Sequence, residues 1–450
     1  MQNFDVVVLS NDKIFQKRIE SLAQGFKYQM VLFENAEKFL DNYQTIGNPE
    51  FIAVDGRLIA IDGTTGMIQL AKQLFPTAPI MVVLGSKTNP ENTQFMKTSG
   101  ASAVLLETEF LTTSKAEFIC SQAVRAQYLS IRGEDLKEGS KIDCNLLHYM
   151  QLNRKYLPVA QAGQEISKEK LDKIKSVSEV YFDKKHLAQV NQYIASHQGQ
   201  GELSVEAKCR NLFLNLGVAF SDLVLSLSDQ SGSVSFAEGK VLYEKTENFV
   251  NEIVKLLSLV SDPWALLYDL KMGQYGIIDR SPIVAGMAGL LSMKAEVGNP
   301  QDAMFSALMS DIGMIELSSG ATFKLRAKKT DDLTSEERVE YEKHPIFSLN
   351  QLLTRKLQLS ENIKNIIVST HERADLSGFP YKPRAEKIPD EALLIQFCEI
   401  FDRDYVNLPV KGRPALTEQK KKHLDQQFMR SGLIGEHFLR RIRNPFLGIT

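Results

Sequence analysis

The chain has 450 residues, of which 43% are hydrophobic and 24% charged, and its formal net charge is −2. This composition predicts a soluble protein with room for about two to four domains, excludes global disorder, and gives no argument for nucleic acid as a partner. Since no apolar run approaches the ~20 residues that span a bilayer and the first residues lack a secretion signal, we expect a cytoplasmic protein without membrane insertion.

Residues 1–128 alternate short apolar runs with stretches of helical spacing. The runs are rich in Val, Ile and Leu, which is typical of buried strands. They are FDVVVLS, MVLFEN, FIAVDG, PIMVVLG and SAVLLE. Alternation of this kind predicts an α/β domain with a parallel sheet and helices on both faces.

The same residues resemble the receiver domain of two-component response regulators, which has a flavodoxin-like fold. Asp55 ends the third predicted strand, Asp62-Gly63 follows it, and a Gly-Ala-Ser segment at Gly100 leads into the fifth. Receivers accept a phosphoryl group on an aspartate beside a magnesium ion that an acidic pair holds, with a hydroxyl and a lysine nearby. The resemblance implies that Asp55 stands at the phosphoacceptor position.

The residues that would assist Asp55 are changed. The acidic pair falls on Ser10-Asn11 with Asp12 just beyond, the hydroxyl falls on Leu84, and the lysine falls on Glu107. A glutamate in place of a lysine moves the local charge by two units, in the direction that repels phosphate. We therefore predict that Asp55 is a vestigial phosphoacceptor. Alternatively, Asp55 is a turn residue at the end of a strand that hydrogen-bonds to local backbone.

The middle of the chain predicts a small α+β module. The polar stretch 133–141 is interpreted as a linker. Residues 139–195 then combine two or three short strands, a turn at Gly163 and a helix that begins at Ser167. The segment 195–204 is a second candidate boundary.

Residues 200–450 have the pattern of an all-α domain. Two long stretches, VEAKCRNLFLNLGVAFSDLVLSL and NFVNEIVKLLSLV, carry apolar residues at intervals of three and four, as bundle helices do. We expect a flexible connection between them at SDQSGSVS. Further along, Thr334 followed by Glu337 predicts a helix start with a capping box.

Four residues in this part are of types that hold divalent metals. Asp311, His344, His371 and Glu399 fall on separate segments with apolar flanks, as inward-facing ligands in a helix bundle must. Taken one at a time, His344 could be an ordinary helix residue, and His371 could belong to a solvated helix end.

The order and spacing of motifs over roughly the last half of the chain resemble the HD-GYP family of bacterial cyclic-di-GMP phosphodiesterases, which belongs to the all-α HD superfamily. The family's His-Asp-Ile-Gly-Lys motif matches Ser310–Met314, its His-Pro matches His344-Pro345, and its His-His-Glu motif with Gly-Tyr-Pro matches Thr370–Pro380. An upstream family histidine falls on Arg280, and a late metal-binding aspartate falls on Glu399.

The resemblance implies that the catalytic groups have largely been lost. The family's chemistry needs two or three metal ions about 3.5–4 Å apart. Imidazoles are missing at Arg280, Ser310 and Thr370. We expect the first metal position to be empty, because a guanidinium has no lone pair. The second draws on Asp311, His344 and His371, and such a set holds at most one divalent transition metal, Fe or Mn. No other cofactor is expected.

Four positions in these motifs are vestigial catalytic positions under the same resemblance. They are Asp311, Met314, Asp375 and Phe379. Met314 replaces a lysine that would face phosphate, and Phe379 lacks the hydroxyl of the family's tyrosine.

Arg280 suggests how the remaining carboxylates are neutralised. We predict that it takes the place of the missing cation in an ion pair with Asp311, Glu399 or both, so that buried carboxylates keep a partner.

These features predict a bacterial signal-transduction protein that has lost catalysis and acts by binding. Its partner would be another signalling protein or a cyclic dinucleotide such as cyclic-di-GMP, and a homodimer is one form it could take. Arg373, Lys382 and Arg384 are candidate phosphate contacts, although an exposed loop with ordinary solubilising charges has the same composition. The alternatives are a reduced-metal phosphodiesterase acting on cyclic-di-GMP or a related dinucleotide, and an oligomerisation scaffold.

Overall fold

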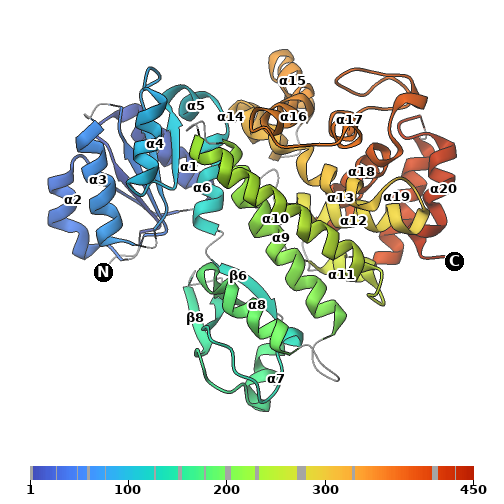
Figure 1. Cartoon of the computed structure of the whole chain (residues 1–450), viewed down its shortest axis with the longest axis horizontal. Helices are drawn as coiled ribbons and strands as arrows, with labels where there is room; N and C mark the ends of the chain where they lie inside the picture. Colours follow the sequence, from blue (N-terminus) through green and yellow to red (C-terminus); the bar gives the residue numbers. More distant parts are fainter. Residues whose placement is uncertain are drawn as a thin grey trace.

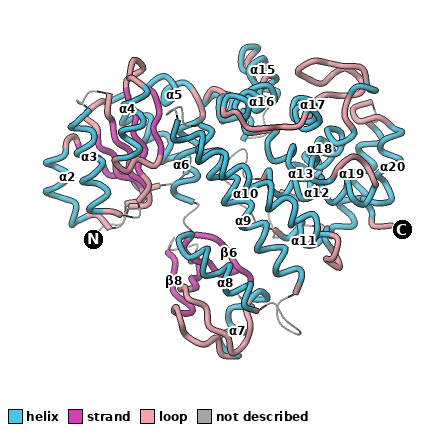
Figure 2. Tube along the Cα trace, in the orientation of Figure 1, coloured by secondary structure: helices cyan, strands magenta, loops and turns pink. Residues whose placement is uncertain are grey.

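The computed structural model shows three parts, an N-terminal α/β domain, a small α+β module and a large helical domain (Figure 1). It describes residues 4–26, 28–47, 49–57, 61–76, 78–125, 128–150, 155–176, 179–197, 204–228, 233–270, 280–326, 330–407, 414–430 and 432–449. Strands are confined to the first two parts, and the third is built from helices and their connecting loops (Figure 2).

The N-terminal domain is a five-stranded parallel sheet with strand order β2-β1-β3-β4-β5. Its strands are β1 (Val6–Leu9), β2 (Met30–Phe33), β3 (Phe51–Asp55), β4 (Ile80–Leu84) and β5 (Ala103–Leu106). Its helices are α1 (Lys13–Phe26), α2 (Ala36–Asn42), α3 (Ile61–Leu74), α4 (Pro90–Thr98), α5 (Glu107–Thr112) and α6 (Lys115–Arg125). This strand order is that of flavodoxin-like doubly wound folds, and the predicted parallel sheet is confirmed.

Both faces of this sheet are buried, which explains the nearly continuous apolar runs. Alternate residues of β1 enter different cores: Val7 and Leu9 pack with α3, whereas Val6 and Val8 pack with α1 and α6. Because parallel strands end at the same edge, Asp55 at the end of β3 lies beside the carboxyl ends of β1 and β4.

The small module is a four-stranded antiparallel sheet with order β6-β9-β7-β8. Its strands are β6 (Tyr128–Arg132), β7 (Leu146–Met150), β8 (Lys155–Ala160) and β9 (Glu179–Asp183), and its helices are α7 (Lys168–Ser176) and α8 (Leu187–Ser196). Gly163 has a φ of +72° in the predicted turn, and Ser167 Oγ accepts from Lys170 N at the predicted helix start.

The linker predicted at 133–141 is wrong, and the module begins before residue 139. β6 pairs with β9, and the polar segment after it packs into the module. Leu136 is 3% exposed, and Asp135 is buried in an ion pair with Arg210. A polar composition therefore did not indicate an exposed segment here.

The helical domain begins with two long helices, α9 (Val205–Ser228) and α10 (Ser233–Leu257), which cross the middle of the molecule (Figure 1). The connection expected at SDQSGSVS is shorter than predicted, because α10 already begins at Ser233. Residues 229–232 of this connection and residues 198–203 of the second predicted boundary lie outside the described residues. Among the described helices, the stretch Val205–Leu227 has the length and mean hydropathy of a membrane span, and 56% of its apolar window is buried, as in core helices of soluble proteins.

Shorter helices make up the rest of the domain. They are α11 (Pro263–Asp269), α12 (Ser281–Ala295), α13 (Pro300–Met309), α14 (Ser319–Arg326), α15 (Ser335–Glu342), α16 (His344–Thr354), α17 (Glu361–Ser369), α18 (Asp390–Phe401), α19 (Leu416–Met429) and α20 (Glu436–Leu447). Among them α12 packs against α9, α10, α11, α13, α18 and α20, and its residues Ser281 to Ser292 are all buried. A 3-10 helix, η4 (Ile312–Glu316), follows α13. The capping box of Thr334 and Glu337 is confirmed at the start of α15.

Candidate metal centre

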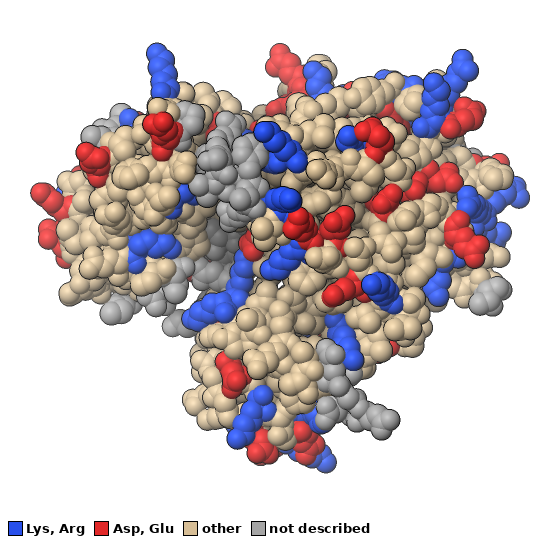
Figure 3. All heavy atoms as spheres, viewed as in Figure 1, with Lys and Arg blue, Asp and Glu red and all other residues tan. Residues whose placement is uncertain are grey.

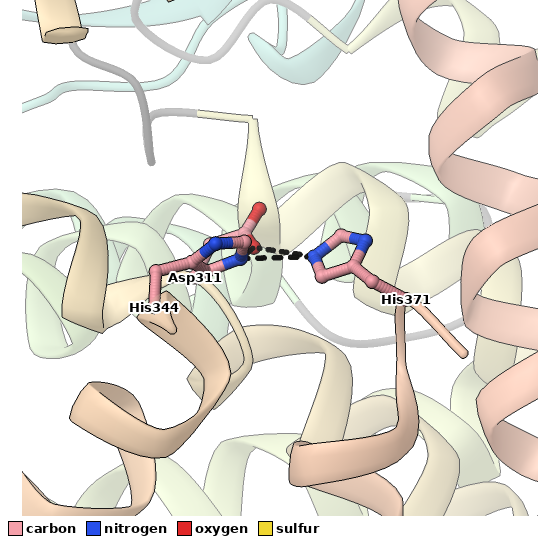
Figure 4. A group of neighbouring side chains, drawn as sticks. All are labelled: Asp311, His344 and His371. Carbon is pink, nitrogen blue, oxygen red and sulfur yellow. Dashed lines mark hydrogen bonds and ion pairs between the residues drawn. The ribbon is translucent and has the colours of Figure 1, made fainter. Parts of the chain in front are cut away.

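Three of the predicted ligands converge from three different elements. Asp311 lies between α13 and η4, His344 is the first residue of α16, and His371 follows the end of α17. Their carboxylate and ring nitrogens point toward one another (Figure 4). Within the part of the chain that the structure describes, they form the one group of three or more His, Cys, Asp or Glu residues with the geometry of a metal site.

The close packing of η4 against α16 fixes the first two of these residues. Gly313 N donates to Ser348 Oγ at 2.8 Å, and Ser348 Oγ donates to Ser310 O at 2.6 Å. A Cβ atom on Gly313 would lie only 2.3 Å from His344 O. Glycine is therefore required at position 313 if Asp311 and His344 are to face each other.

The spacing of the donor atoms fits a single ion. Nε2 of His344 lies 2.9 Å from Nε2 of His371 and 3.2 Å from Asp311 Oδ1, and the third separation, His371 Nε2 to Asp311 Oδ1, is 3.5 Å. Around an ion with bonds of about 2.1 Å, neighbouring ligands lie about 3.0 Å apart in octahedral and about 3.4 Å apart in tetrahedral geometry. Three ligands also leave coordination positions for water or a bound anion.

His344 is oriented for metal binding by a backbone carbonyl. Its Nδ1 lies 2.6 Å from Tyr341 O, and since a carbonyl only accepts, Nδ1 carries the proton. Nε2 then presents its lone pair to the centre. This is the usual arrangement of a metal-bound histidine, whose other ring nitrogen donates its N–H to a carbonyl or a carboxylate. The Tyr341 ring also stacks on the imidazole, with the ring centroids 5.0 Å apart.

The electrostatics of the cluster favour a charged Asp311 and a neutral His371. Burial alone would raise the pKa of Asp311, but His344 and His371 in their protonated forms donate hydrogen bonds and positive charge to it, and these outweigh burial and lower the pKa. Burial lowers the pKa of His371. A deprotonated carboxylate and a neutral imidazole are the forms that bind a metal ion.

Glu399, the fourth predicted ligand, stands beside the cluster and not within it. It projects from α18, and its Oε2 lies 3.8 Å from Nδ1 of His371, on the far side of that ring from Nε2. Burial and the neighbouring charge of Asp311 raise its pKa well above the ordinary value. Glu399 therefore adds a carboxyl group next to a ligand, as outer partners of metal-bound histidines do.

Arg280 forms an internal ion pair, but its predicted partners, Asp311 and Glu399, are wrong. Its Nε and Nη2 donate to both carboxylate oxygens of Asp402, at 3.1 and 2.5 Å. Asp402 lies three residues after Glu399, about one helical turn further along. Both side chains of the pair are largely buried. That this pair replaces a metal stays a prediction.

The two small residues that stand for lost imidazoles turn away from the centre. Ser310 Oγ donates to Ala307 O at 3.2 Å, and Thr370 Oγ1 donates to Ile367 O at 3.1 Å. Both hydroxyls are thereby bound to a carbonyl of the preceding helical turn, so neither is oriented as a ligand.

Phe379 covers the two histidines. Its ring stacks on His371 with centroids 5.0 Å apart, and it meets the edge of His344 at 5.9 Å. The loop that carries Phe379 is held by Glu372, which is 1% exposed and accepts from the backbone N–H groups of Tyr381 and Lys382. Sequence reasoning missed this role of Glu372, although its place directly after His371 was a signal.

The other predicted residues around the site have separate surroundings. Met314 lies in a small apolar cluster with Leu317, Ala321 and Leu333. Asp375 is exposed and accepts from Ser377 N at 2.9 Å, which makes it a turn residue.

The three candidate phosphate contacts lie on or next to the same loop. Arg373 donates to Ser377 Oγ at 3.3 Å, and its charge acts on His371, which places it close to the centre. Lys382 and Arg384 are exposed.

A second charged site surrounds Asp55, and its key residue is Arg57, which sequence reasoning missed. Asp55 is 2% exposed and accepts from Ser10 Oγ at 2.7 Å. Arg57 Nε and Nη2 each donate to it at 2.9 Å, and the backbone N–H of Arg57 donates to Oδ1 at 3.2 Å. The same guanidinium pairs with Asp12 at 3.0 Å and Glu107 at 2.8 Å. An internal cation thus fills this acidic pocket.

On the face shown in Figure 3, basic and acidic side chains are interspersed, and neither sign gathers into one large patch. This view agrees with the near-neutral net charge.

Comparison with known proteins identifies the domain around the metal centre. Residues 270–420 match the family model described as HD domain, which confirms the predicted HD-superfamily domain for this segment. HD domains are typically metal-dependent. A search of curated proteins finds no match to the chain. Among solved structures, the chain is similar to Bd1817, a HDG"Y"P protein from Bdellovibrio bacteriovorus, with 16% identity and a TM-score of 0.41 over 70% of this chain and 98% of that chain.

Proposed function

We propose that this chain is a cytoplasmic bacterial signalling protein whose helical domain, of HD-GYP descent, binds one metal ion and acts by binding without hydrolysis. Its N-terminal domain is a receiver-like domain that is not phosphorylated. The observation that supports the proposal most is the contrast within the helical domain: Asp311, His344 and His371 form a complete ligand set, whereas Arg280 is held by Asp402.

The contrast has a direct chemical meaning. A metal ion on the three ligands would supply a Lewis acid with open coordination positions, suited to an oxygen of a phosphate group. Phosphodiester hydrolysis of the HD-GYP type needs further ions about 3.5–4 Å away to activate water and neutralise charge. A guanidinium already bound to a carboxylate at the place of a lost ligand gives no such ion a site.

The ligand of this centre is a cyclic dinucleotide such as cyclic-di-GMP or an acidic group of another signalling protein. Arg373 is the cation placed to meet a phosphate beside His371, because it lies two residues after that histidine in the chain. The side chains of Lys382 and Arg384 are exposed and supply two further cations on the adjoining loop. The homodimer remains a prediction.

One observation favours the second candidate, a reduced-metal phosphodiesterase acting on cyclic-di-GMP or a related cyclic dinucleotide. His344 has the carbonyl partner and the protonation that an active metal ligand needs, and Glu399 stands beside His371 as a further carboxyl group. A site kept only as a relic has no need for this orientation.

Metal analysis and calorimetry separate the two. We expect purified protein to carry no more than one transition metal ion per chain, to bind cyclic-di-GMP without turnover, and to lose the metal on His371→Ala. His437→Ala, at an exposed histidine of α20, is the matched control. Turnover of cyclic-di-GMP that His371→Ala abolishes, with one or two metal ions per chain, would refute the binding function and establish the enzyme.

A further inference from the structure

The N-terminal domain contacts the segment that carries Asp311. Ser114, which precedes α6, donates its backbone N–H and its hydroxyl to Leu317 O at 2.8 and 2.9 Å. Thr113 forms an isolated antiparallel bridge with Ser318. Arg18 of α1 donates to Ser319 Oγ at 2.5 Å. These bonds join residues about 200 to 300 positions apart in the chain.

A buried lysine lies at the centre of this contact. The side chain of Lys115, the first residue of α6, is 3% exposed. Its Nζ lies 2.6 Å from Glu109 Oε1 on α5 and 3.0 Å from Glu316 Oε1 on η4. One ammonium group therefore joins two carboxylates that belong to different domains.

Glu316 connects this lysine to both elements that begin at metal ligands. It is the last residue of η4, which starts directly after Asp311. It also accepts from Gln351 Nε2 at 2.9 Å, and Gln351 lies on α16, whose first residue is His344. The ion pair thus reaches η4 and α16 at the ends that lie away from the metal centre.

The acidic pocket of the N-terminal domain lies at the other end of the same connection. Glu107, the first residue of α5, is held by Arg57, and Glu109 follows on the same helix. The internal cation Arg57 therefore fixes the start of the helix whose second carboxylate holds Lys115.

We propose that Lys115 is a positioning residue for the metal centre, and that the N-terminal domain is a fixed part of the metal-binding unit. Lys115 holds Glu316, and through it η4, in the position where Asp311 faces the two histidines. The class of ligand that this arrangement serves is a divalent metal cation. The effect of Lys115 on metal binding rests on the proposed function. Its effect on the position of η4 does not depend on any metal.

Removing the ammonium of Lys115 would leave Glu109, whose side chain is 11% exposed, and Glu316, which is 30% exposed, facing each other as two negative charges. Losing one partner of such a partly buried ion pair costs more than losing one at the surface. The least costly relaxation is for η4 to move out toward solvent with Glu316. Such a movement separates Asp311 from His344 and so weakens metal binding. We expect a change of about 10-fold, the lower end of the range for groups that contact metal ligands directly.

The test uses the full chain and two readouts, amide hydrogen exchange and Mn²⁺ calorimetry. In the metal-free protein, we expect Lys115→Met to accelerate exchange of the amides of residues 313–317 at least about 10-fold. In the calorimeter, we expect Mn²⁺ to bind about 10-fold more weakly. Lys38→Met, at an exposed lysine of α2 paired with Glu34, is the matched control and should change neither readout.

Glu316→Gln is the second variant, because it keeps the pair of Lys115 with Glu109 and removes only the interdomain charge. It should accelerate the same amides in a protein that folds, even where Lys115→Met does not fold. Unchanged exchange at 313–317 in Glu316→Gln would overturn the inference. If the wild type binds no Mn²⁺ while the variants still accelerate exchange, the metal function fails and the positioning by Lys115 stands.

Discussion

Replacing Arg57 by methionine tests whether an internal cation stabilises the acidic pocket. The Arg57 side chain is 6% exposed and contacts Asp55, Asp12 and Glu107. Asp55 dominates because its side chain is only 3% exposed, and removing one partner of a buried ion pair costs about 3–5 kcal/mol. The other two carboxylates are 24% and 38% exposed, so each adds at most about 1 kcal/mol. We expect Arg57→Met to lower the free energy of unfolding of the N-terminal domain by about 3–7 kcal/mol.

The effect of Arg57→Met should depend on pH in a defined direction. The pKa of Asp12 lies below its ordinary value of 3.8, first because Phe15 N donates to it and in part because Arg57 pairs with it. A lowered folded-state pKa contributes stability that is present above the unfolded value and is lost as pH falls through the folded value. The part of the difference that comes from Asp12 should therefore be full at pH 7 and shrink below about pH 4.

The assay is hydrogen exchange of the β3 amides as a function of urea, because these amides report on the N-terminal domain alone. Adding Asp55→Asn to Arg57→Met should recover part of the loss, since it removes the buried carboxylate that the first change leaves unpaired. Arg440→Met, at an exposed arginine paired with Glu436, should cost less than about 0.5 kcal/mol. A loss below about 1 kcal/mol in Arg57→Met, or no recovery in the double variant, would refute the reasoning.

Three further outcomes concern Asp55, Lys420 and Gly313. A small phosphodonor should give no stable label on the protein, because a guanidinium occupies the pocket of Asp55, and labelling that Asp55→Asn abolishes would contradict this. Burial lowers the pKa of Lys420 to about 8. The wild type should therefore gain stability between pH 8 and 10.5, because the folded protein releases this proton at lower pH than the unfolded chain does, and Lys420→Met should lack this gain. Urea unfolding followed by tryptophan fluorescence measures both proteins. Gly313→Ala should abolish Mn²⁺ binding in calorimetry, because its Cβ would lie 2.3 Å from His344 O, while Gly66→Ala, with nothing within 4 Å, should leave binding unchanged.

The sequence predicted those parts of the fold that depend on burial patterns. Strands buried on both faces leave continuous apolar runs, and for this reason the parallel sheet of residues 1–128 was predicted correctly. The segment 133–141 failed for the opposite reason. Its burial depends on single residues, Leu136 in the core and Asp135 against Arg210, and local composition contains no record of such distant partners.

The same distinction applies to the candidate site. Motif spacing brought Asp311, His344 and His371 together correctly, because each follows or begins a helix whose apolar face fixes its direction. The partner of Arg280 could not be predicted from the sequence. Glu399 and Asp402 lie about one turn apart on adjoining helical segments, and the sequence does not show which of them faces the start of α12.

Arg57 did leave a signal in the sequence. Glu107 stands where the receiver resemblance expects a lysine, and a new carboxylate beside buried Asp55 requires a new cation nearby. Arg57, two residues after Asp55, is the basic residue that local geometry allows to reach both. When one residue of a charged pocket has the opposite sign to the one expected, a compensating charge should be sought close to the remaining residues of that pocket.

The two domains each contain a guanidinium held by a buried carboxylate. Arg57 pairs with Asp55 in the N-terminal domain, and Arg280 pairs with Asp402 in the helical domain. Because a guanidinium stays charged, each of these carboxylates is neutralised within the protein and gains little from an ion in solution. Asp311 differs, because its partners among the described residues are the imidazoles of His344 and His371, which carry no permanent charge. A divalent cation therefore gains most at Asp311, and this difference in fixed charge is the physical reason to expect metal at the helical domain's centre and not at the acidic pocket of the N-terminal domain.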